Sequence, residues 1–193
     1  LRPDSGGAGK YRGGCGVVFE FEVLAPDCVI IARGMERLRF QPWGLRGGDC
    51  GANGRIEVKR AGADRFEQIH KADALRASVG DVVRLSPAGG GGSGQPIERD
   101  ARRVLDDVLN GFVTVAGAER NYGVVIGNGV VDAAATTRLR EARRRSEVPA
   151  LHTLGAARME YERLWNDEVS KAMTDIVFGL PQPMRYEVRA RLW

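Results

Sequence analysis

Glycine is concentrated in three short stretches of the chain, and any fold of this sequence has to accommodate them. The 193 residues include 26 glycines, clustered at 6–16, 47–54 and 89–94, which is about twice the usual share of ~7%. Because glycine lacks a Cβ, it adopts positive φ easily and lets a second backbone or a ligand approach closely. The clusters have no periodic spacing, so they predict three glycine-rich loops rather than a collagen-like repeat.

The first cluster also carries five polar side chains: Asp4, Ser5, Lys10, Tyr11 and Arg12. Polar groups set between glycines converge on whatever approaches the backbone there. The positive charges of Lys10 and Arg12 suit a phosphorylated or carboxylated molecule, and Tyr11 suits its organic part. A simpler interpretation stays open, in which a glycine-rich turn leads into a strand and Arg12 pairs with an acid of the fold.

The segment after the first cluster has the pattern of a strand. Residues 16–24 alternate phenylalanine or valine with glutamate, the period of two that a half-buried strand shows. After a turn at Pro26, an apolar run over 28–32 predicts a second strand. We expect these two strands to form a hairpin.

Other strand patterns fill the rest of the first half, at 38–40, 56–59 and 81–86. The segment 61–78 is polar, with Ile69 and Leu75 as its apolar anchors. We therefore expect the first half to be rich in strands, antiparallel and meander-like.

Helix signals begin near residue 100. Asp100 is expected to cap one helix, and Thr114 a short helix that Gly123 ends. Asp132 is expected to cap a third helix that runs to about Arg145. Between the second and third helices, two valine-rich runs flank a glycine–asparagine–glycine turn, which predicts a small hairpin.

One long amphipathic helix is expected from about 154 to 178, because its apolar residues form a single broad stripe. Gly179 and Pro181 would stop it. Such a stripe indicates packing on a core or on a partner rather than a cofactor site.

These patterns predict an α+β fold, with a β-rich antiparallel N-terminal half that contains the glycine-rich loops and a helical C-terminal half. We expect three parts: a β-rich glycine-loop domain at 1–97, a helix and hairpin segment packed on it at 98–148, and a helical tail for packing or assembly at 149–193. The chain begins at Leu1, without methionine and directly before the first cluster, so we expect a part of a longer polypeptide or a processed product.

The net charge and the position of the basic residues indicate which kinds of partner the chain could bind. The chain carries +4, and much of the surplus lies in one arginine run made of Arg138, Arg140, Arg143, Arg144 and Arg145. The run lacks interleaved aromatic residues and any known nucleic-acid module. It therefore favours a solvated helix face, or a face that docks on an acidic partner, over nucleic-acid binding.

The cysteines, the histidines and the hydropathy of the chain argue against a disulfide framework, a metal site and a membrane span. Cys15, Cys28 and Cys50 are odd in number and far apart, which argues against a disulfide framework or a zinc site and favours a reduced, cytoplasmic setting. His70 and His152 are the two histidines, so we expect no complete metal site within the chain. No apolar run approaches the ~18 residues that a membrane span needs.

Nucleotide motifs fail in detail. Gly9-Lys10 resembles part of a phosphate-binding loop, but Tyr11 stands where a serine or threonine has to hold magnesium. Residues 89–94 match the glycine spacing of a dinucleotide fingerprint, but Gln95-Pro96-Ile97 follows where a helix should begin. The residues alone therefore indicate a glycine-loop α+β domain without self-sufficient catalytic machinery.

Three segments taken together resemble the C-terminal region of the hydantoinase B/oxoprolinase family. They are the stretch 4–14, Pro42-Trp-Gly-Leu-Arg-Gly-Gly48, and the stretch 89–100. Segments 121–125 and 131–136 also resemble that family. The ordered set covers about residues 1–140, and the remaining residues resemble the family's helical tail more loosely.

The resemblance implies an activity that belongs to a complex. B-type subunits of this family pair with larger A-type subunits that bind ATP and Mg²⁺, and the complex acts on a small molecule. Hydantoinase and oxoprolinase members open a cyclic amide through a phosphorylated intermediate, whereas related acetone and acetophenone carboxylases fix bicarbonate onto a ketone. The implied partners are the A-type subunit and the upstream part of the B-type subunit, and any divalent metal lies elsewhere in the complex.

Three functions therefore remain. The first is a C-terminal part or small subunit of an ATP-dependent hydantoinase or 5-oxoprolinase-type hydrolase, not active alone. The second is a subunit of a ketone carboxylase. The third is a non-catalytic assembly module of such a complex, in which the apolar helix and the arginine run only bind larger subunits.

Overall fold

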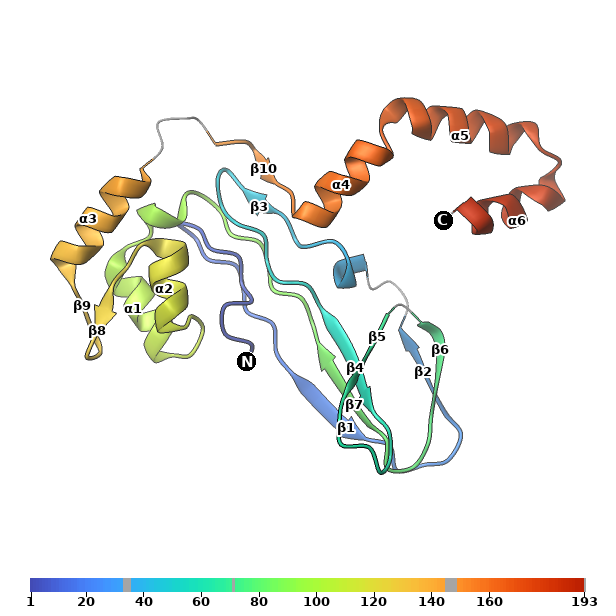
Figure 1. The fold of residues 1–193 in the computed structure, drawn as a ribbon, viewed down its shortest axis with the longest axis horizontal. Helices are drawn as coiled ribbons and strands as arrows, with labels where there is room; N and C mark the ends of the chain where they lie inside the picture. The colour runs from blue at the N-terminus through green and yellow to red at the C-terminus, as the bar shows by residue number, and fades with distance from the viewer. Residues whose placement is uncertain (33–35, 71, 145–148, 193) are drawn as a thin grey trace. The chain divides into compact units, whose positions relative to one another are not determined.

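A computed structural model describes residues 1–32, 36–70, 72–144 and 149–192. The chain divides into two compact units, Leu1–Gly155 and Ala156–Trp193. Strands dominate the first part of the first unit and helices the rest of the chain (Figure 1), which confirms the α+β class. The finer division into parts 1–97, 98–148 and 149–193 stays a prediction.

A four-stranded antiparallel sheet, in the order β1-β7-β4-β5, forms the larger sheet of the first unit. Its strands are β1 (Phe19–Glu22), β4 (Arg55–Lys59), β5 (Glu67–Ile69) and β7 (Val82–Ser86). The strands expected within 16–24, 56–59 and 81–86 are therefore confirmed. Their order differs from a meander, because β7 lies between β1 and β4.

A second antiparallel pair, β2 (Cys28–Ala32) with β6 (Ala72–Ala77), supplies the other side of a hydrophobic core. This core contains Val23, Val58, Leu75, Ala77 and Val83, all buried, with Ile30 and Ile69 packed against it. Both anchors expected in the segment 61–78, Ile69 and Leu75, therefore face the core. That segment also holds the two strands β5 and β6, which the sequence did not predict.

The predicted hairpin between β1 and β2 is wrong, because β1 pairs with β7 and β2 with β6. Pairing with β7 matches the residues on both faces of β1. Phe21 lies opposite Val83, and Glu20 lies opposite Arg84, whose Nε donates to the glutamate at 2.9 Å. Pairing with the apolar β2 would leave that glutamate without a cationic neighbour.

The strand expected at 38–40 is also wrong. A 3₁₀ helix covers Glu36–Leu38, and the next strand is β3 (Gly44–Leu45). The backbone oxygen of Arg37 accepts hydrogen bonds from the amide of Gly54 at 2.9 Å and the side chain of Asn53 at 3.1 Å. These bonds to a distant loop hold the segment in a turn.

The three glycine clusters are extended segments packed directly on one another. The backbone amide of Gly7 donates to Gly90, and that of Gly92 donates to Asp49, at 2.8 and 2.9 Å. A Cβ at Gly91 would overlap the carbonyl of Trp43, and one at Gly89 would overlap the backbone of Ser5. Glycine is required here by the close approach of neighbouring backbones, so the prediction of glycine-rich loops that a second backbone approaches closely is confirmed.

A helical subdomain follows the third cluster. It consists of the 3₁₀ helix η2 (Pro96–Glu98), α1 (Ala101–Leu109), α2 (Val115–Tyr122), the hairpin β8 (Ile126–Gly127) and β9 (Val130–Val131), and α3 (Ala133–Arg143). Its core contains Val104, Val113, Ala118, Tyr122 and Val124, together with Ala8 from the first glycine cluster. The first cluster therefore packs against the other two glycine clusters through its backbone, and against the helical subdomain through Ala8.

Helix boundaries in this subdomain follow the predicted caps. The Asp100 carboxylate accepts from the amides of Arg102 and Arg103, and the Thr114 hydroxyl accepts from the amide of Gly117.

The other predicted boundaries are also present. Gly123 ends α2 with φ of 62°, and Asp132 caps α3. The predicted end of α3 at Arg145 lies outside the described residues, and the helix as described ends at Arg143.

In the second unit, two helices replace the single helix expected at about 154–178, and a further helix follows among the described residues. They are α4 (Ala156–Leu164), α5 (Asp167–Gly179) and α6 (Gln182–Leu192); β10 (His152–Thr153), which pairs with β3, belongs to the first unit. The single helix is wrong because the Asn166 side chain accepts from the amide of Val169 and starts a new helix. Gly179 ends α5 as predicted.

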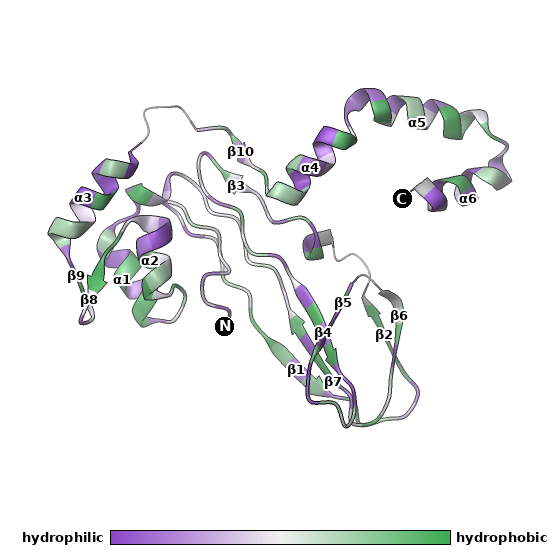
Figure 2. Cartoon of the chain, in the orientation of Figure 1, coloured by the Kyte–Doolittle hydropathy of each residue, from purple (hydrophilic) through white to green (hydrophobic). Residues whose placement is uncertain are grey.

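The apolar stripe of the tail is largely uncovered within this unit. Figure 2 shows hydrophobic and hydrophilic residues alternating in bands along α5, and Ile176 and Phe178 are exposed. Among the described residues, no helix is both long enough and apolar enough to cross a membrane.

Replacing Gly91 tests the close packing of backbones. We expect Gly91→Ala to lower stability by about 3 kcal/mol or to prevent folding, because the new methyl group overlaps the Trp43 carbonyl. Gly14→Ala is the matched control from the first cluster, since a Cβ there meets nothing within 4 Å. Thermal unfolding measures both, and equal melting temperatures would contradict the packing.

The hydrogen-bonded carboxylate of Asp81 makes the stability of the folded protein depend on pH. Its carboxylate accepts from the amides of Ser78 and Ala61 and from Arg60, and these bonds lower the pKa of Asp81 to about 2. The stabilisation is therefore present above the ordinary aspartate pKa of ~4 and lost as pH falls toward 2. We expect Asp81→Asn to lower the melting temperature at pH 7, with the difference from wild type shrinking between about pH 5 and pH 2. A difference that stays constant with pH would count against this role.

Candidate functional site

Asp4 and Ser5 face into the protein. Asp4 has φ of 58°, and its carboxylate accepts from the amide and the hydroxyl of Thr114 at 3.0 and 2.6 Å. It thereby places a negative charge at the N-terminus of α2, where the helix dipole favours one. Ser5 is buried, and its hydroxyl donates to the backbone of Arg2 and accepts from the amide of Gly16. Asp4 therefore fastens the N-terminal stretch to α2, and Ser5 links the two ends of the first cluster to each other.

Arg12 lies in a buried ion network with one acid and a second arginine. Its Nε is 3.2 Å from the Asp107 carboxylate, and its guanidinium lies 4.8 Å from the centre of the Phe112 ring. Arg99 donates to the same carboxylate oxygen through Nε at 3.1 Å and Nη2 at 2.8 Å. The network therefore holds two positive charges and one negative charge. The pairing of Arg12 with an acid of the fold, left open by the sequence, is present.

Lys10 and Tyr11 are the members of the first cluster whose side chains lie at the surface. The Lys10 ammonium is 3.4 Å from the Glu98 carboxylate, and both side chains are about half exposed. Tyr11 is 63% exposed, although its backbone pairs with that of Ser93. The backbone oxygen of Lys10 accepts from Arg99 at 3.1 Å. Arg99 therefore connects the surface lysine to the buried network of Arg12.

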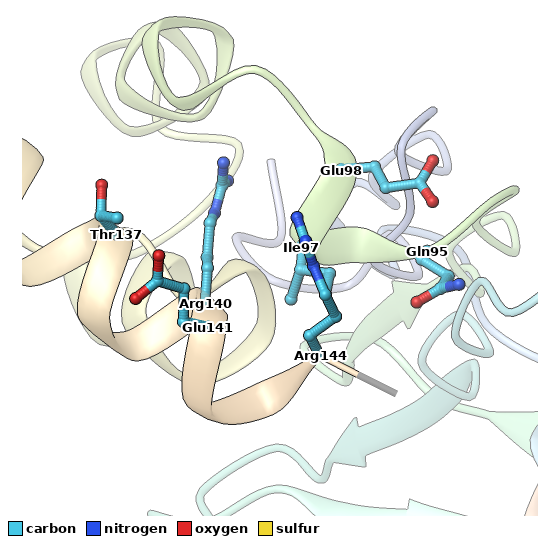
Figure 3. Close-up of a pocket in the computed structure, with 7 residues that line it drawn as sticks. All are labelled: Gln95, Ile97, Glu98, Thr137, Arg140, Glu141 and Arg144. Carbon is cyan, nitrogen blue, oxygen red and sulfur yellow. The ribbon is translucent and has the colours of Figure 1, made fainter. Parts of the chain in front are cut away.

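Glu98 also lines a surface cavity of about 510 Å³. Figure 3 shows it between α3 and the segment that contains η2, with Arg140 extending from the helix and Arg144 from the residue that follows it. The lining residues are Gln95, Ile97, Glu98, Thr137, Arg140, Glu141 and Arg144. Two guanidinium groups, two carboxylates, an amide and a hydroxyl offer donors and acceptors for a polar molecule. The described lining contains no cysteine, histidine or serine that would act as a nucleophile or base.

Part of the arginine run has a structural role. Arg140 donates to the backbone oxygens of Tyr122 and Arg99 at 3.1 and 2.7 Å. Arg143 donates to the oxygens of Glu119 and Arg120. The carbonyls of Glu119, Arg120 and Tyr122 lie at the C-terminal end of α2, which attracts positive charge. Burial lowers the pKa of Arg140, but an arginine remains protonated at neutral pH. The run is therefore neither a free basic patch nor wholly solvated.

The remaining thiols and imidazoles are dispersed. Cys15, Cys28 and Cys50 are free thiols, and Cys50 donates to the backbone oxygen of Thr153. His152 lies edge-on to Trp43 with ring centres 5.6 Å apart. Within residues 1–32, 36–70, 72–144 and 149–192, no three histidine, cysteine or acidic side chains group together as metal ligands would.

Sequence reasoning singled out the surface lysine and tyrosine and the arginine run, but it predicted neither the cavity nor the ion pairs of Lys10 and Arg12. The cavity depends on Gln95, Glu98 and Arg140, which come from the end of the third cluster and from α3. Glu98 and Asp107 lie in the helical half of the sequence, far from their partners Lys10 and Arg12. An alternating pattern of acidic and basic residues would have been the signal for these ion pairs. Charged residues are common throughout this region, however, so the sequence does not show which acid pairs with which base.

Replacing Asp107 tests the buried network. We expect Asp107→Asn to cost about 3 kcal/mol of unfolding free energy, because two largely buried arginines lose their counter-charge. Its neighbour Asp106 is exposed, so Asp106→Asn should change stability by less than ~0.5 kcal/mol. Denaturant unfolding of both variants checks this. Equal effects of the two substitutions would rule out a stabilising role for the network.

Comparison with known proteins gives consistent matches. Residues 1–96 match the family model described as hydantoinase B/oxoprolinase. An uncharacterized protein of Methanocaldococcus jannaschii is 40% identical over 146 residues, which cover 72% of this chain and 25% of that protein. Caprolactamase subunit beta of Pseudomonas jessenii is 38% identical over 146 residues, covering 70% of this chain and 24% of the subunit.

Two solved structures share the fold. The ATP-dependent caprolactamase of Pseudomonas jessenii superposes with a TM-score of 0.57 and 33% identity over 73% of this chain and 25% of that one. A nucleotide-free acetone carboxylase gives a TM-score of 0.59 over 92% of this chain and 26% of that one, and its 23% identity bears on the fold alone. This chain thus spans about a quarter of the length of the curated relatives it matches.

Proposed function

We propose that this chain, which belongs to the hydantoinase B/oxoprolinase family, forms part of the B-type subunit of an ATP-dependent complex that opens a cyclic amide. The observation that carries the proposal is the likeness to caprolactamase in both sequence and fold. That enzyme is named for a cyclic amide and described as ATP-dependent. In this proposal the activity requires the whole complex, and the chain is not active alone.

The chemistry explains why ATP is needed. An amide carbonyl is a poor electrophile because the nitrogen lone pair is delocalised onto it. Transfer of a phosphoryl group from ATP to the carbonyl oxygen makes the carbon more electrophilic. We place ATP and Mg²⁺ on a larger A-type partner, and any further divalent metal outside this chain. One water then attacks that carbon, the C–N bond of the ring breaks, and phosphate is released, leaving ADP and the opened amino acid. Other water has to be kept from the phosphorylated species, because transfer of the phosphoryl group to water would waste ATP.

The residues of the first cluster divide into two roles in this proposal. Lys10 and Tyr11 contact the phosphorylated intermediate, because their side chains lie at the surface. The Lys10 ammonium, shared with Glu98, stabilises phosphate charge, and Tyr11 packs on the organic ring. Asp4, Ser5 and Arg12 act indirectly, since their hydrogen bonds and ion pair hold the backbone on either side.

Reconstitution of the complete complex tests the reaction. The full-length protein that contains this chain is combined with its ATP-binding partner and offered lactams, hydantoin and 5-oxoproline, or acetone with labelled bicarbonate. We expect ring opening with stoichiometric ATP hydrolysis. Fixation of bicarbonate without ring opening would overturn the proposal in favour of a ketone carboxylase. Assembly without either reaction would favour a module that only binds larger subunits.

Lys10 offers the sharpest test of the site. We expect Lys10→Ala to lower kcat/KM for ring opening at least tenfold, about 1.4 kcal/mol of transition-state stabilisation, with assembly unchanged. Lys59→Ala is the matched control, because that lysine lies on β4 beside Phe66 and outside the first glycine cluster. Turnover of Lys10→Ala equal to that of Lys59→Ala would remove Lys10 from the site. Arg12→Ala should depress both turnover and stability, since its ion pair is buried.

A further inference from the structure

The outer edge of β1 is open. Figure 1 shows β1 at the margin of the four-stranded sheet, where it pairs only with β7 among the described strands. The amide of Val23 donates to Asp81 at 2.8 Å, so the backbone of Val23 faces β7. In an antiparallel ladder, successive residues point alternately to either side. The amides and carbonyls of Glu20 and Glu22 therefore point away from β7, toward the open edge.

Apolar side chains accompany this open edge. Phe19 and Phe21 are 57% and 41% exposed. Their register partners Leu85 and Val83 lie on the sheet face that packs on the core under β2 and β6. The apolar face thus continues beyond its covered part as far as β1. Native proteins protect edges of this kind with charges, bulges or a covering element, because an exposed apolar edge recruits further strands.

The opposite face of β1 is acidic. Glu20 accepts from Arg84, whereas Glu22 is exposed and makes no ion pair within the described part of the chain. A strand added here would place its own residues directly across from these two glutamates. Basic residues are favoured at those positions, and acidic ones are disfavoured. Residues facing Phe19 and Phe21 would have to be apolar.

We propose that the edge of β1 binds an extended strand of a partner polypeptide in which basic and apolar residues alternate. A second copy of this chain does not fit, because antiparallel pairing of two β1 strands sets glutamate against glutamate. Main-chain hydrogen bonds bind the strand, and its alternating side chains give specificity.

Amide hydrogen exchange measured by NMR on the 193-residue protein tests the proposal directly. A capped peptide of alternating lysine and valine, seven residues long, should slow exchange of the Glu20 and Glu22 amides at least tenfold. The Phe21 amide, which faces β7, should change far less. A glutamate–valine peptide and a scrambled lysine–valine peptide are the controls. The net charge of +4 would favour the acidic peptide if binding were non-specific.

Two substitutions of Glu22 separate backbone pairing from charge. Glu22→Pro removes the outward N–H and should weaken binding at least tenfold, while the β7 side of the strand keeps its bonds. Glu22→Lys should shift preference toward the glutamate–valine peptide. Glu168→Lys, on α5, is the charge control and should leave binding unchanged.

Three results would overturn the proposal. The first is unslowed exchange of both amides at saturating lysine–valine peptide. The second is equal binding of the acidic and basic peptides. The third is protection of the same amides that rises with protein concentration in the absence of peptide, which would assign the edge to a second copy. None of these outcomes depends on the enzymatic activity of the complex.

Discussion

Direct contact between backbones is the constraint on which the first unit depends. Segments from all three glycine clusters lie against one another with no side chain between them, so that Gly7 bonds to Gly90 and Gly92 to Asp49. A methyl group at Gly89 or Gly91 would occupy the space of a neighbouring carbonyl. Packing at this distance satisfies the buried amides through mutual hydrogen bonds, which side-chain packing alone cannot do. It also brings together parts of the chain that are far apart in sequence.

The packed glycine segments position the polar groups of the candidate site. Because the first cluster is held on one side by backbone and on another by α2, its side chains have fixed directions. Asp4 reaches the N-terminus of α2, Arg12 reaches Asp107, and Lys10 remains at the surface beside Glu98. The buried network therefore supports the surface pair rather than competing with it.

Local signals in the sequence predicted local structure well. Asp100, Thr114 and Asp132 cap helices where expected, because an N-cap needs only the amides two or three residues ahead. The strands at β1, β4 and β7 follow from alternation in the same way. The wrong predictions concern which strand β1 pairs with and how far one helix continues. The chain pairs β1 with β7 instead of β2, and Asn166 divides the expected long helix. The candidate site was found in part, because Glu98 and Asp107 meet the first cluster only in three dimensions.

By itself the sequence determined the α+β class, the helix caps, the family resemblance and the need for glycine in three clusters. These properties depend on residue type and short spacing. Only the tertiary structure decided that the clusters pack on each other, that Arg12 shares Asp107 with Arg99, and that β1 keeps an open edge. Each of these depends on contacts across tens of residues, where many pairings satisfy the same local pattern. The pairing that forms is the one that matches residues on both faces of the strands and satisfies the buried hydrogen-bonding groups.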